Sequence, residues 1–576
     1  MAQEVLLSPG VLLNENDQSQ IILGTVTAGL SLVGPTVKGQ PNIPILVTSY
    51  SDFKSKYGDA FVSASNTYEY LTSIAAYNYF QQGGQSILVT RVVTGSYTAA
   101  TTTSGTKISG STGVTETFVL ETLSQGAIMN SAGPTGPNGT LLSGSANNVR
   151  WEIQSPNTSS GVFTVVIRQG DDTATNPSVL ETWTNVSLDP NAANFVSRVI
   201  GDKTRTVGYD DTTGNYYIQE SGSYNNASAY VRVKSVLTPT PNYFNNDGTF
   251  KSQYTASIPV AASGSFGGAT GREAGDIPAN LFENINSSNT QGVSSAAYTF
   301  ASNLLANSEN YDFTLLSVPG ITQVDYSSTV SSFITLAENR GDCFYITDLV
   351  GYNATVGSVV IQAAGLNTNY AAAYWPWVQV LSQASGKLVW VPASTIMPGV
   401  YAFNDRVAAE WFAPAGLNRG GLGGVLQAER KLAVGERDSL YVGKVNPIAS
   451  FPGVGLVAYG QKTLQTQASA LDRVNVRRLL IALKRYIGNI AETLLFEQNT
   501  IATRNNFLSQ VNPYLEAVQQ RQGLYAYRVV MDDTNNTSDV IDRNQLVGQV
   551  YIQPTKTIEY IQLTFNITPT GVTFGA

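Results

Sequence analysis

The most constraining feature of this 576-residue sequence is a long amphipathic helix, expected from Asp472 to about Asn499. We expect Asp472 to cap the helix, because its carboxylate can accept hydrogen bonds from the free amides of the first turn. The apolar residues of the segment recur at steps of three and four. They therefore share one stripe along the helix: Val476, Leu479, Leu480, Leu483, Ile487, Ile490 and Leu494.

Basic residues lie beside this stripe. At about 100° per residue, Arg473, Arg477 and Lys484 fall together on one flank, whereas Arg478 and Arg485 lie on the back of the helix. Five basic residues against three acidic ones make the segment +2 in a chain whose net charge is −8. Two interpretations are open: the flank faces another protein, or it is a solvated helix face with small intrahelical ion pairs.

A second helix is expected after this one, kinked or split at Pro513 and ended by Gly523. The hydrophobic period then changes to two, which predicts strands over residues 525–531, 549–553 and 558–567. A long apolar strand with few charges tends to pair with another strand. We therefore expect the last segment to join a sheet, of its own or of another subunit, through the side that carries Ile561, Leu563, Phe565 and Ile567.

Composition removes several classes of function. The sequence contains no histidine, which rules out Ser–His–Asp triads, histidine proton shuttles and imidazole metal ligands. Its single cysteine, Cys343, cannot form an intramolecular disulfide or a cysteine-rich metal site, and we expect an inert thiol on a buried strand. A net charge of −8 argues against general nucleic-acid binding. We predict a non-enzymatic protein without cofactor or metal.

Two further motifs invite functional interpretations. The stretch GSFGGATGREAG (264–275) resembles a phosphate-binding loop, but Arg272 and Glu273 stand where lysine and serine or threonine would be needed, so we expect a connector over 255–290. Trp375 and Trp377 flank Pro376 and could form a ligand platform. Buried packing at a domain junction is the interpretation we favour.

The pattern along the chain predicts an α+β or α/β multidomain protein with discontinuous, nested domains and extended strand arms at both ends. Helix and strand alternate before residue 96 and again after residue 290, which suggests one shared domain with parallel strand pairing. Short β runs separated by turn residues lie between them. The expected parts are an N-terminal arm (1–24), an α/β middle domain (25–95 plus 251–365), an inserted β-rich outer domain (96–250), a C-terminal α/β domain (366–554) and a C-terminal strand arm (555–576).

The N-terminal arm contains two short apolar runs separated by Pro9-Gly10, each too short for a helix with its own core. It is either the first strand of its own domain or a strand added to a neighbouring subunit, through Val5, Leu7, Val11 and Leu13. The first residues lack the basic and apolar regions of a signal peptide, and no run approaches eighteen apolar residues. We therefore expect a soluble chain, made in a cytoplasm, with no membrane insertion.

Several segments resemble one known family. RVNVRRLLIALKRYIGNIAETLLFEQN (473–499), followed by the closing strand IEYIQLTFNI (558–567), resembles the C-terminal domain of contractile-phage tail sheath proteins. Other segments resemble the same family in the same order: SPGVLLNEND, VGPTVKGQPNIPILVTSYSDFKSKYG, YNYFQQGGQSILVTRVV, YWPWVQV, VPAS with PGVYAFND, and WFAPAG. Together they span roughly residues 1–95 and 300–570.

The resemblance implies a structural subunit of a myovirus-type contractile tail, assembled in the host cytoplasm and present in the virion. Its expected partners are other copies of itself in helical, hexamer-type rings, the tail tube protein, and the baseplate and tail terminator proteins. Sheath subunits exchange terminal strands with their neighbours, so the resemblance assigns that role to both arms. The flank of Arg473, Arg477 and Lys484 is our candidate for facing the tube or a neighbouring subunit.

Two alternatives from other classes remain at this stage. A surface-layer or adhesin-like protein would suit the Thr-, Ser-, Asn- and Gly-rich insertion, but it should carry an export signal. A tail-associated glycan hydrolase would need a pair of carboxylates and an aromatic platform such as Trp375 and Trp377. Carboxylates are scattered along this sequence, and no pair reads as a catalytic dyad.

Overall fold

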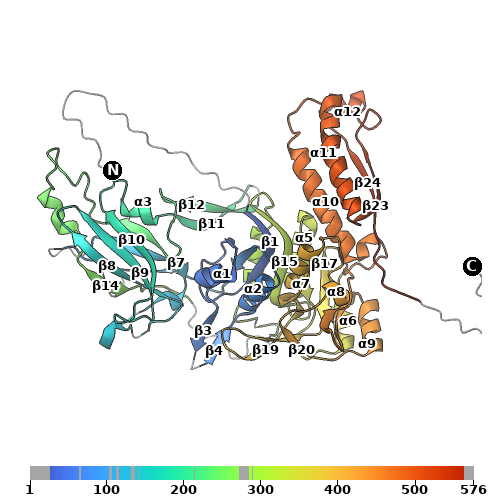
Figure 1. Ribbon diagram of the computed structural model, residues 1–576, viewed down its shortest axis with the longest axis horizontal. Helices are drawn as coiled ribbons and strands as arrows, with labels where there is room; N and C mark the ends of the chain where they lie inside the picture. Colours follow the sequence, from blue (N-terminus) through green and yellow to red (C-terminus); the bar gives the residue numbers. More distant parts are fainter. Residues whose placement is uncertain are drawn as a thin grey trace, which may run out of the picture.

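A computed structural model describes residues 26–63, 66–102, 107–111, 116–131, 136–141, 143–212, 214–271, 285–288 and 290–562. Figure 1 shows a β-rich part on one side, a central α/β body, and a helical hairpin that projects from the far side of that body. Each of the three has its own cluster of buried apolar side chains. The expected multidomain α/β architecture is confirmed at this level.

The central body is built on one eight-stranded sheet. Its inner strands pair in parallel, and the short strands at its two ends pair antiparallel. Strands buried on both faces by crossover helices are near-continuous apolar runs, and this sheet follows that rule. Its order is β2 (Ile45–Val47), β5 (Ile87–Arg91), β1 (Val26–Gly34), β15 (Tyr311–Thr322), β16 (Phe344–Asp348), β17 (Ala371–Trp375), β21 (Asn446–Phe451) and β22 (Gly455–Ala458).

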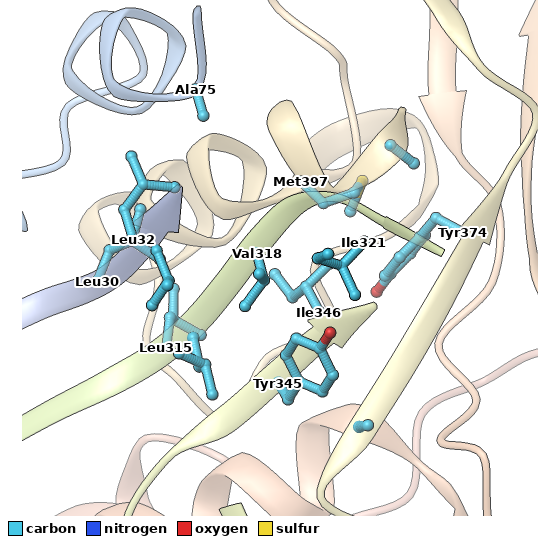
Figure 2. Close-up of a cluster of buried hydrophobic side chains, with 14 of the residues drawn as sticks. Leu30, Leu32, Ala75, Leu315, Val318, Ile321, Tyr345, Ile346, Tyr374 and Met397 are labelled. Carbon is cyan, nitrogen blue, oxygen red and sulfur yellow. The ribbon is translucent and has the colours of Figure 1, made fainter. Parts of the chain in front are cut away.

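Helices cover the sheet and complete its core. Figure 2 shows Leu30, Leu315 and Ile346 from three neighbouring strands gathered with Ala75 from α2 and Met397 from α7. The helices of this body are α1 (Tyr50–Tyr57), α2 (Leu71–Gln81), α4 (Ser295–Leu304), α5 (Ser327–Arg340), α6 (Val356–Ala364), α7 (Met397–Val407), α8 (Gly416–Arg419) and α9 (Val434–Val442). Small antiparallel ribbons lie at its border: β3 (Ala60–Ser63) with β4 (Asn66–Glu69), and β18 (Val378–Leu381) with β19 (Leu388–Val391) and β20 (Val425–Ala428).

The domain boundary expected between residues 365 and 366 does not separate two sheets, because one sheet continues across it. Strand β16 pairs directly with β17 across it, with Tyr345 opposite Ala371. The same apolar cluster includes residues from both sides of the boundary. Loop-rich sequence over 370–470 concealed this continuity, because the two strands that join the sheet there are short.

Cys343 directly precedes β16 and is fully buried, as expected for a core thiol. Burial raises the pKa of this thiol to about 12, so it stays protonated at neutral pH. Trp375 and Trp377 are also buried, and the Trp377 indole donates to the Val350 carbonyl at 3.1 Å. Their burial is confirmed, but they lie within the core of the central body rather than at a junction between two domains, and a buried indole cannot serve as an open platform.

The β-rich part forms between β5 and α4 in the sequence. A four-stranded sheet packs with a three-stranded one around a separate core, beside a two-stranded ribbon. Its strands are β6 (Ala99–Thr101), β7 (Phe118–Gln125), β8 (Val149–Asn157), β9 (Val162–Gln169), β10 (Val179–Ser187), β11 (Thr204–Asp210), β12 (Asn215–Ser221), β13 (Val231–Val236) and β14 (Ala262–Ser265), with a short helix α3 (Val196–Ile200).

The connector expected over 255–290 is wrong for its first part. Ala262–Ser265 forms β14, which pairs antiparallel with β8, and Phe266 is buried in the core of the β-rich part. The expected inserted domain therefore extends past residue 250. Residues 272–284, which contain Arg272 and Glu273, lie outside the described residues.

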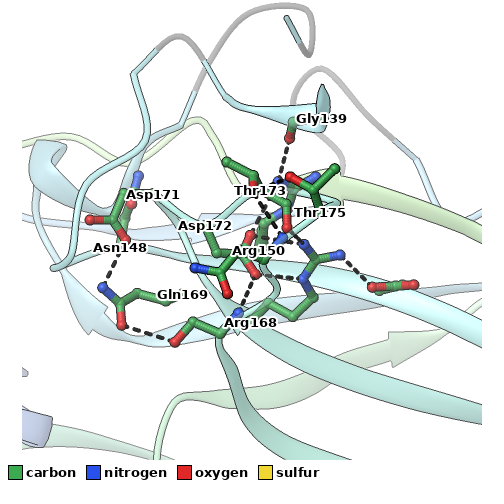
Figure 3. A network of polar contacts seen from close by, with 12 residues as sticks. Gly139, Asn148, Arg150, Arg168, Gln169, Asp171, Asp172, Thr173 and Thr175 are labelled. Carbon is green, nitrogen blue, oxygen red and sulfur yellow. Dashed lines mark hydrogen bonds and ion pairs between the residues drawn. The ribbon is translucent and has the colours of Figure 1, made fainter. Parts of the chain in front are cut away.

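An ionic network stabilises the outer end of this part (Figure 3). Arg168 donates to both oxygens of Asp172, at 2.7 and 3.0 Å, and to Glu152 at 2.6 Å. Arg150 reaches the same Asp172 at 3.4 Å and the Gly139 carbonyl at 2.7 Å. These side chains are mostly buried, so each charge depends on its partners. The network joins the β9–β10 turn to the segment around Gly139.

The projecting hairpin contains the two helices expected near the C-terminus. Helix α10 runs from Val474 to Glu492 and packs against α11 (Ile501–Gln520), β23 (Leu524–Val530) and β24 (Gln549–Pro554). A short helix, α12 (Ser538–Asp542), lies between the two strands. The strands expected over 525–531 and 549–553 are confirmed within one residue.

Three details of the hairpin differ from expectation. Asp472 is not the cap of α10: Arg473 takes that position, and the Val474 amide donates to the Gln461 carbonyl at 2.8 Å instead. Pro513 does not split α11, because it lies on the exposed face, where water can satisfy the carbonyl that it frees.

The left-handed residue after α11 is Gln522 rather than Gly523. Glycine is needed at position 523 because the backbone there packs against Val518, and a Cβ atom would lie only 2.5 Å from the Val518 side chain. No strand is assigned to residues 555–562. Residues 1–25 and 563–576 lie outside the described residues, and with them Val5, Leu7, Val11, Leu13, Leu563, Phe565 and Ile567.

A buried carboxyl in the central body makes folding pH-dependent. Asp348 ends β16 and accepts from the backbone amide of Ser394 at 3.1 Å and from its hydroxyl. Burial raises the pKa of Asp348 to about 7, although the Ser394 hydrogen bonds act in the opposite direction. The folded pKa is therefore above the value of about 3.9 for an unfolded aspartate.

We expect the stability that Asp348 contributes to be fully present below pH ~4 and lost as the pH rises to ~7. The unfolding free energy of the wild type should fall over this window relative to Asp348→Asn, by at most about 4 kcal/mol at about 1.4 kcal/mol per pKa unit. Urea unfolding followed by tryptophan fluorescence measures this difference. Replacement of the exposed Asp438 by Asn is the control. The prediction would be contradicted if the difference in unfolding free energy between the wild type and Asp348→Asn did not change with pH.

Candidate assembly interface

The expected basic flank of α10 does not form one exposed surface. Arg477 is 4% exposed, and its guanidinium lies 4.1 Å from the centre of the Tyr370 ring. Arg473 binds carboxylates of its own chain, Asp472 at 2.9 Å and Glu559 at 2.7 Å. Only Lys484 of the three is exposed. The prediction of a shared flank is wrong, because the helix turns two of its basic residues toward the rest of the chain.

The two arginines placed on the back of the helix attach α10 to the central body. Arg478 is buried and binds both oxygens of Asp405, at 2.8 and 2.6 Å. Arg485 binds Asp312 of β15 at 2.6 Å. Charge-assisted pairs with two-point geometry are stronger than neutral hydrogen bonds and fix orientation. The basic residues of α10 therefore hold the hairpin on the sheet.

Glu559 fastens the beginning of the C-terminal segment. The Arg473 guanidinium contacts both carboxylate oxygens, at 2.7 and 3.0 Å, and the Gln461 amide donates at 3.1 Å. Tyr441 adds a further hydrogen bond. Burial acts to raise the pKa of Glu559, but these hydrogen bonds and the Arg473 charge outweigh it and lower the pKa. We call Glu559 with Arg473, Gln461 and Tyr441 the clasp.

The residues around the clasp glutamate face outward. Ile558, Tyr560 and Ile561 are all exposed, although each is large and apolar. Glu559 is the only charged residue of the expected strand 558–567. This isolated charge is the feature of the sequence that could have indicated its role. Where the C-terminal segment leaves the body, its one charged side chain is bound and its apolar side chains are exposed. This pattern is typical of a segment that pairs with another surface.

A groove opens beside this segment. Its volume is about 1060 Å³, and its walls include Trp411, Phe412, Arg437, Tyr459 and the segment 555–560 itself. The neighbouring ribbon of β23 and β24 has only two strands. One side of it packs on α11, while Tyr525 and Tyr551 stay exposed. The outer edges of a two-stranded ribbon carry backbone donors and acceptors that can accept a further strand.

The described part of the chain contains no cluster of three or more aspartate, glutamate or cysteine side chains positioned to hold a metal ion. Within the same residues, no helix combines the length and the apolar character that crossing a bilayer requires.

Family models match two successive parts of the chain. Residues 291–464 match the phage tail sheath protein central domain, and residues 466–568 match the phage tail sheath C-terminal domain. The second match contains the hairpin and the clasp glutamate. These two parts of the chain are thus similar to successive domains of phage tail sheath proteins.

Individual relatives agree with this assignment. The tail sheath protein of Vibrio phage KVP40 is 40% identical over 224 residues, which are 39% of this chain and 33% of that protein. The tail sheath protein of Enterobacteria phage T4 is 38% identical over 229 residues, 40% of this chain and 35% of that protein. The matched region is thus about a third of the length of these relatives.

The fold extends beyond the matched sequence. The crystal structure of the sheath tail protein from Listeria innocua aligns over 92% of this chain and 96% of its own, with a TM-score of 0.53 and 11% identity. At this identity the comparison concerns the fold alone. The chain therefore shares the fold of that protein over 92% of its length.

We expect the clasp to protect the chain from cleavage after Lys556. Glu559→Gln and Arg473→Ala should each increase the rate of trypsin cleavage at Lys556 by about fivefold, because a half-buried, two-point ion pair contributes on the order of 1 kcal/mol. Arg430→Ala, which breaks the exposed pair with Glu436, is the matched control and should change nothing there. Mass spectrometry of timed digests measures the rates.

The same cleavage should depend on pH. Because the folded pKa of Glu559 is lowered, the clasp is stable above the unfolded value of about 4.3 and is lost as the pH falls through the folded pKa. An acid-active protease would reveal this opening. A cleavage rate that is equal in the wild type and in Glu559→Gln would show that the clasp does not hold the segment.

Proposed function

We propose that this chain is the structural subunit of a contractile phage tail sheath. In this proposal the subunits form a helical array of rings around a tail tube, and contraction of the array drives the tube through the host envelope. The observation that carries the proposal is the sheath C-terminal domain over residues 466–568, which follows directly on the sheath central domain. The sheath-like fold of nearly the whole chain supports it.

The proposed assembly mechanism is strand exchange through the arms 1–24 and 555–576. Three features support it: the two-stranded β23–β24 ribbon, the groove beside it, and the outward-facing Ile558, Tyr560 and Ile561. Backbone hydrogen bonds to an added strand are largely independent of sequence, so they can persist while rigid subunits rotate. Head-to-tail contacts of this kind generate helices rather than closed oligomers.

Contraction in this proposal consumes no fuel. An array stores energy when it assembles in the less stable of two packings, and a difference of a few kcal/mol per subunit becomes large over many subunits. The clasp would keep the base of each C-terminal arm fixed on its own subunit during this change. We propose the tail tube, the baseplate and a tail terminator as further partners, and a role that is structural and not enzymatic.

We expect the full-length chain to form tubular polymers by itself, visible by negative-stain electron microscopy. A chain truncated after Thr557, which lacks both the clasp glutamate and the exchanged strand, should form none. A second truncation after Gln562 keeps the clasp and removes only the residues beyond it, and it should also fail to polymerise. If both truncated chains form polymers, the C-terminal strand is not part of the assembly mechanism. If the intact chain does not polymerise even around a purified tail tube, the sheath proposal is contradicted.

A further inference from the structure

A small cavity lies where the β-rich part meets the central body (Figure 1). Its volume is about 30 Å³, more than the roughly 10–15 Å³ that one water-sized occupant needs. The body contributes most of the lining, including residues 35–37, 91–94 and 291–293, and the β-rich part contributes Tyr97 and residues 126–128. Thr94 at its border is exposed, so a dissolved ion has a way in.

The cavity lies at the carboxyl ends of neighbouring parallel strands. β1 ends at Gly34 and β5 ends at Arg91, and these two strands pair in parallel. Gln291 of the lining donates to the Pro319 carbonyl of β15 at 3.1 Å. The chain continues from β1 to β5 on one side of the sheet and from β15 to β16 on the other, so the connections diverge at this place. Open parallel sheets generally bind their ligands at such a point.

Arg91 is the only charged side chain among the described residues that line the cavity. It is 3% exposed, and its Nη1 donates to the Gly39 and Gln125 carbonyls. The guanidinium lies 5.1 Å from the centre of the Tyr97 ring. Its Nε is buried and has no hydrogen-bond partner in the described part of the chain. A buried donor beside the cavity is therefore left without an acceptor, which is costly.

The positive charge of Arg91 is also uncompensated. Among the described residues six arginines are buried, and four of them bind a carboxylate: Arg150, Arg168, Arg478 and Arg504. Arg477 lies against the Tyr370 ring instead, and Arg91 borders the cavity. Burial lowers the pKa of Arg91 to about 10, so the guanidinium still carries its charge at neutral pH. A buried charge of this kind needs a counter-charge close by.

We propose that the cavity binds a small monovalent anion, such as chloride, as the counter-ion of Arg91. A water molecule could accept a hydrogen bond from Nε but would leave the charge uncompensated, whereas an anion supplies both the acceptor and the charge. The volume is too small for a nucleotide. The anion would lie between the central body and the β-rich part, and it would therefore stabilise their junction. This inference is independent of whether the chain assembles into a sheath.

Hydrogen exchange at the junction tests the proposal in the full-length chain. The Gln125 amide donates to the Gly39 carbonyl at 3.0 Å, so its exchange reports separation of the two parts. Chloride at ten times its dissociation constant should slow this exchange by about tenfold relative to gluconate, a larger anion, at equal ionic strength. Arg91→Met should abolish the chloride effect. Arg477→Met, which removes the other buried arginine without a carboxylate, is the matched control and should retain it. Mass spectrometry of the peptide that contains Gln125 measures the rates.

Bromide provides a second measurement that needs no variant to fold. Crystals of the wild type soaked in sodium bromide should show an anomalous scattering peak beside the Arg91 guanidinium, and the absence of a peak there would overturn the proposal. Equal exchange of the wild type in chloride and gluconate would overturn it as well, and this is the result expected if water or a carboxylate of the chain occupies the cavity. A chloride effect that persists in Arg91→Met would place the ion elsewhere and would also contradict the assignment.

Discussion

The structure depends on one strand pairing. Strand β1 lies beside β15 in parallel register, with Leu30 opposite Leu315, although 285 residues separate them in the sequence. This pairing joins the strands that precede the β-rich insertion and those that follow it into one central sheet. Buried apolar side chains on both strands make the pairing favourable, because Leu30, Leu32 and Val33 of β1 and Leu315, Leu316 and Val318 of β15 are removed from water. The insertion can therefore vary as a separate unit with its own core, while the sheet that supports the hairpin is unchanged.

Charge has three separate uses in this molecule. In the insertion, Arg168 and Asp172 are buried together and hold loops in place. On α10, Arg478 and Arg485 fasten the hairpin to the body. At the clasp, Arg473 holds the start of the C-terminal segment. In each case the positive charge is paired with a carboxylate of the same chain.

These attachments divide the C-terminal region into a fixed part and two parts that face outward. The hairpin is fixed by ion pairs at its base, and the clasp marks where the fixed part ends. Beyond the clasp lie apolar side chains that no part of the described chain covers, and at the other end of the hairpin Leu495, Phe496 and Ile501 are exposed. A subunit that rotates while it stays attached to neighbouring subunits needs such a division. Contacts that are retained during the rotation and contacts that are exchanged must involve different residues.

The sequence by itself determined the class of the fold, the amphipathic helix α10, both strands of the ribbon and the resemblance to tail sheath proteins, because local periodicity and motif order are written in neighbouring residues. It also excluded histidine chemistry outright. Only the tertiary structure decided where the basic residues of α10 point, since Asp405, Asp312 and Glu559 are 73 to 173 residues distant and helical phase alone cannot reveal partners so far along the chain. It likewise decided that β16 and β17 belong to one sheet, and that Leu495, Phe496 and Ile501 are exposed at the end of the hairpin. Those facts depend on which distant surfaces meet, which periodicity does not encode.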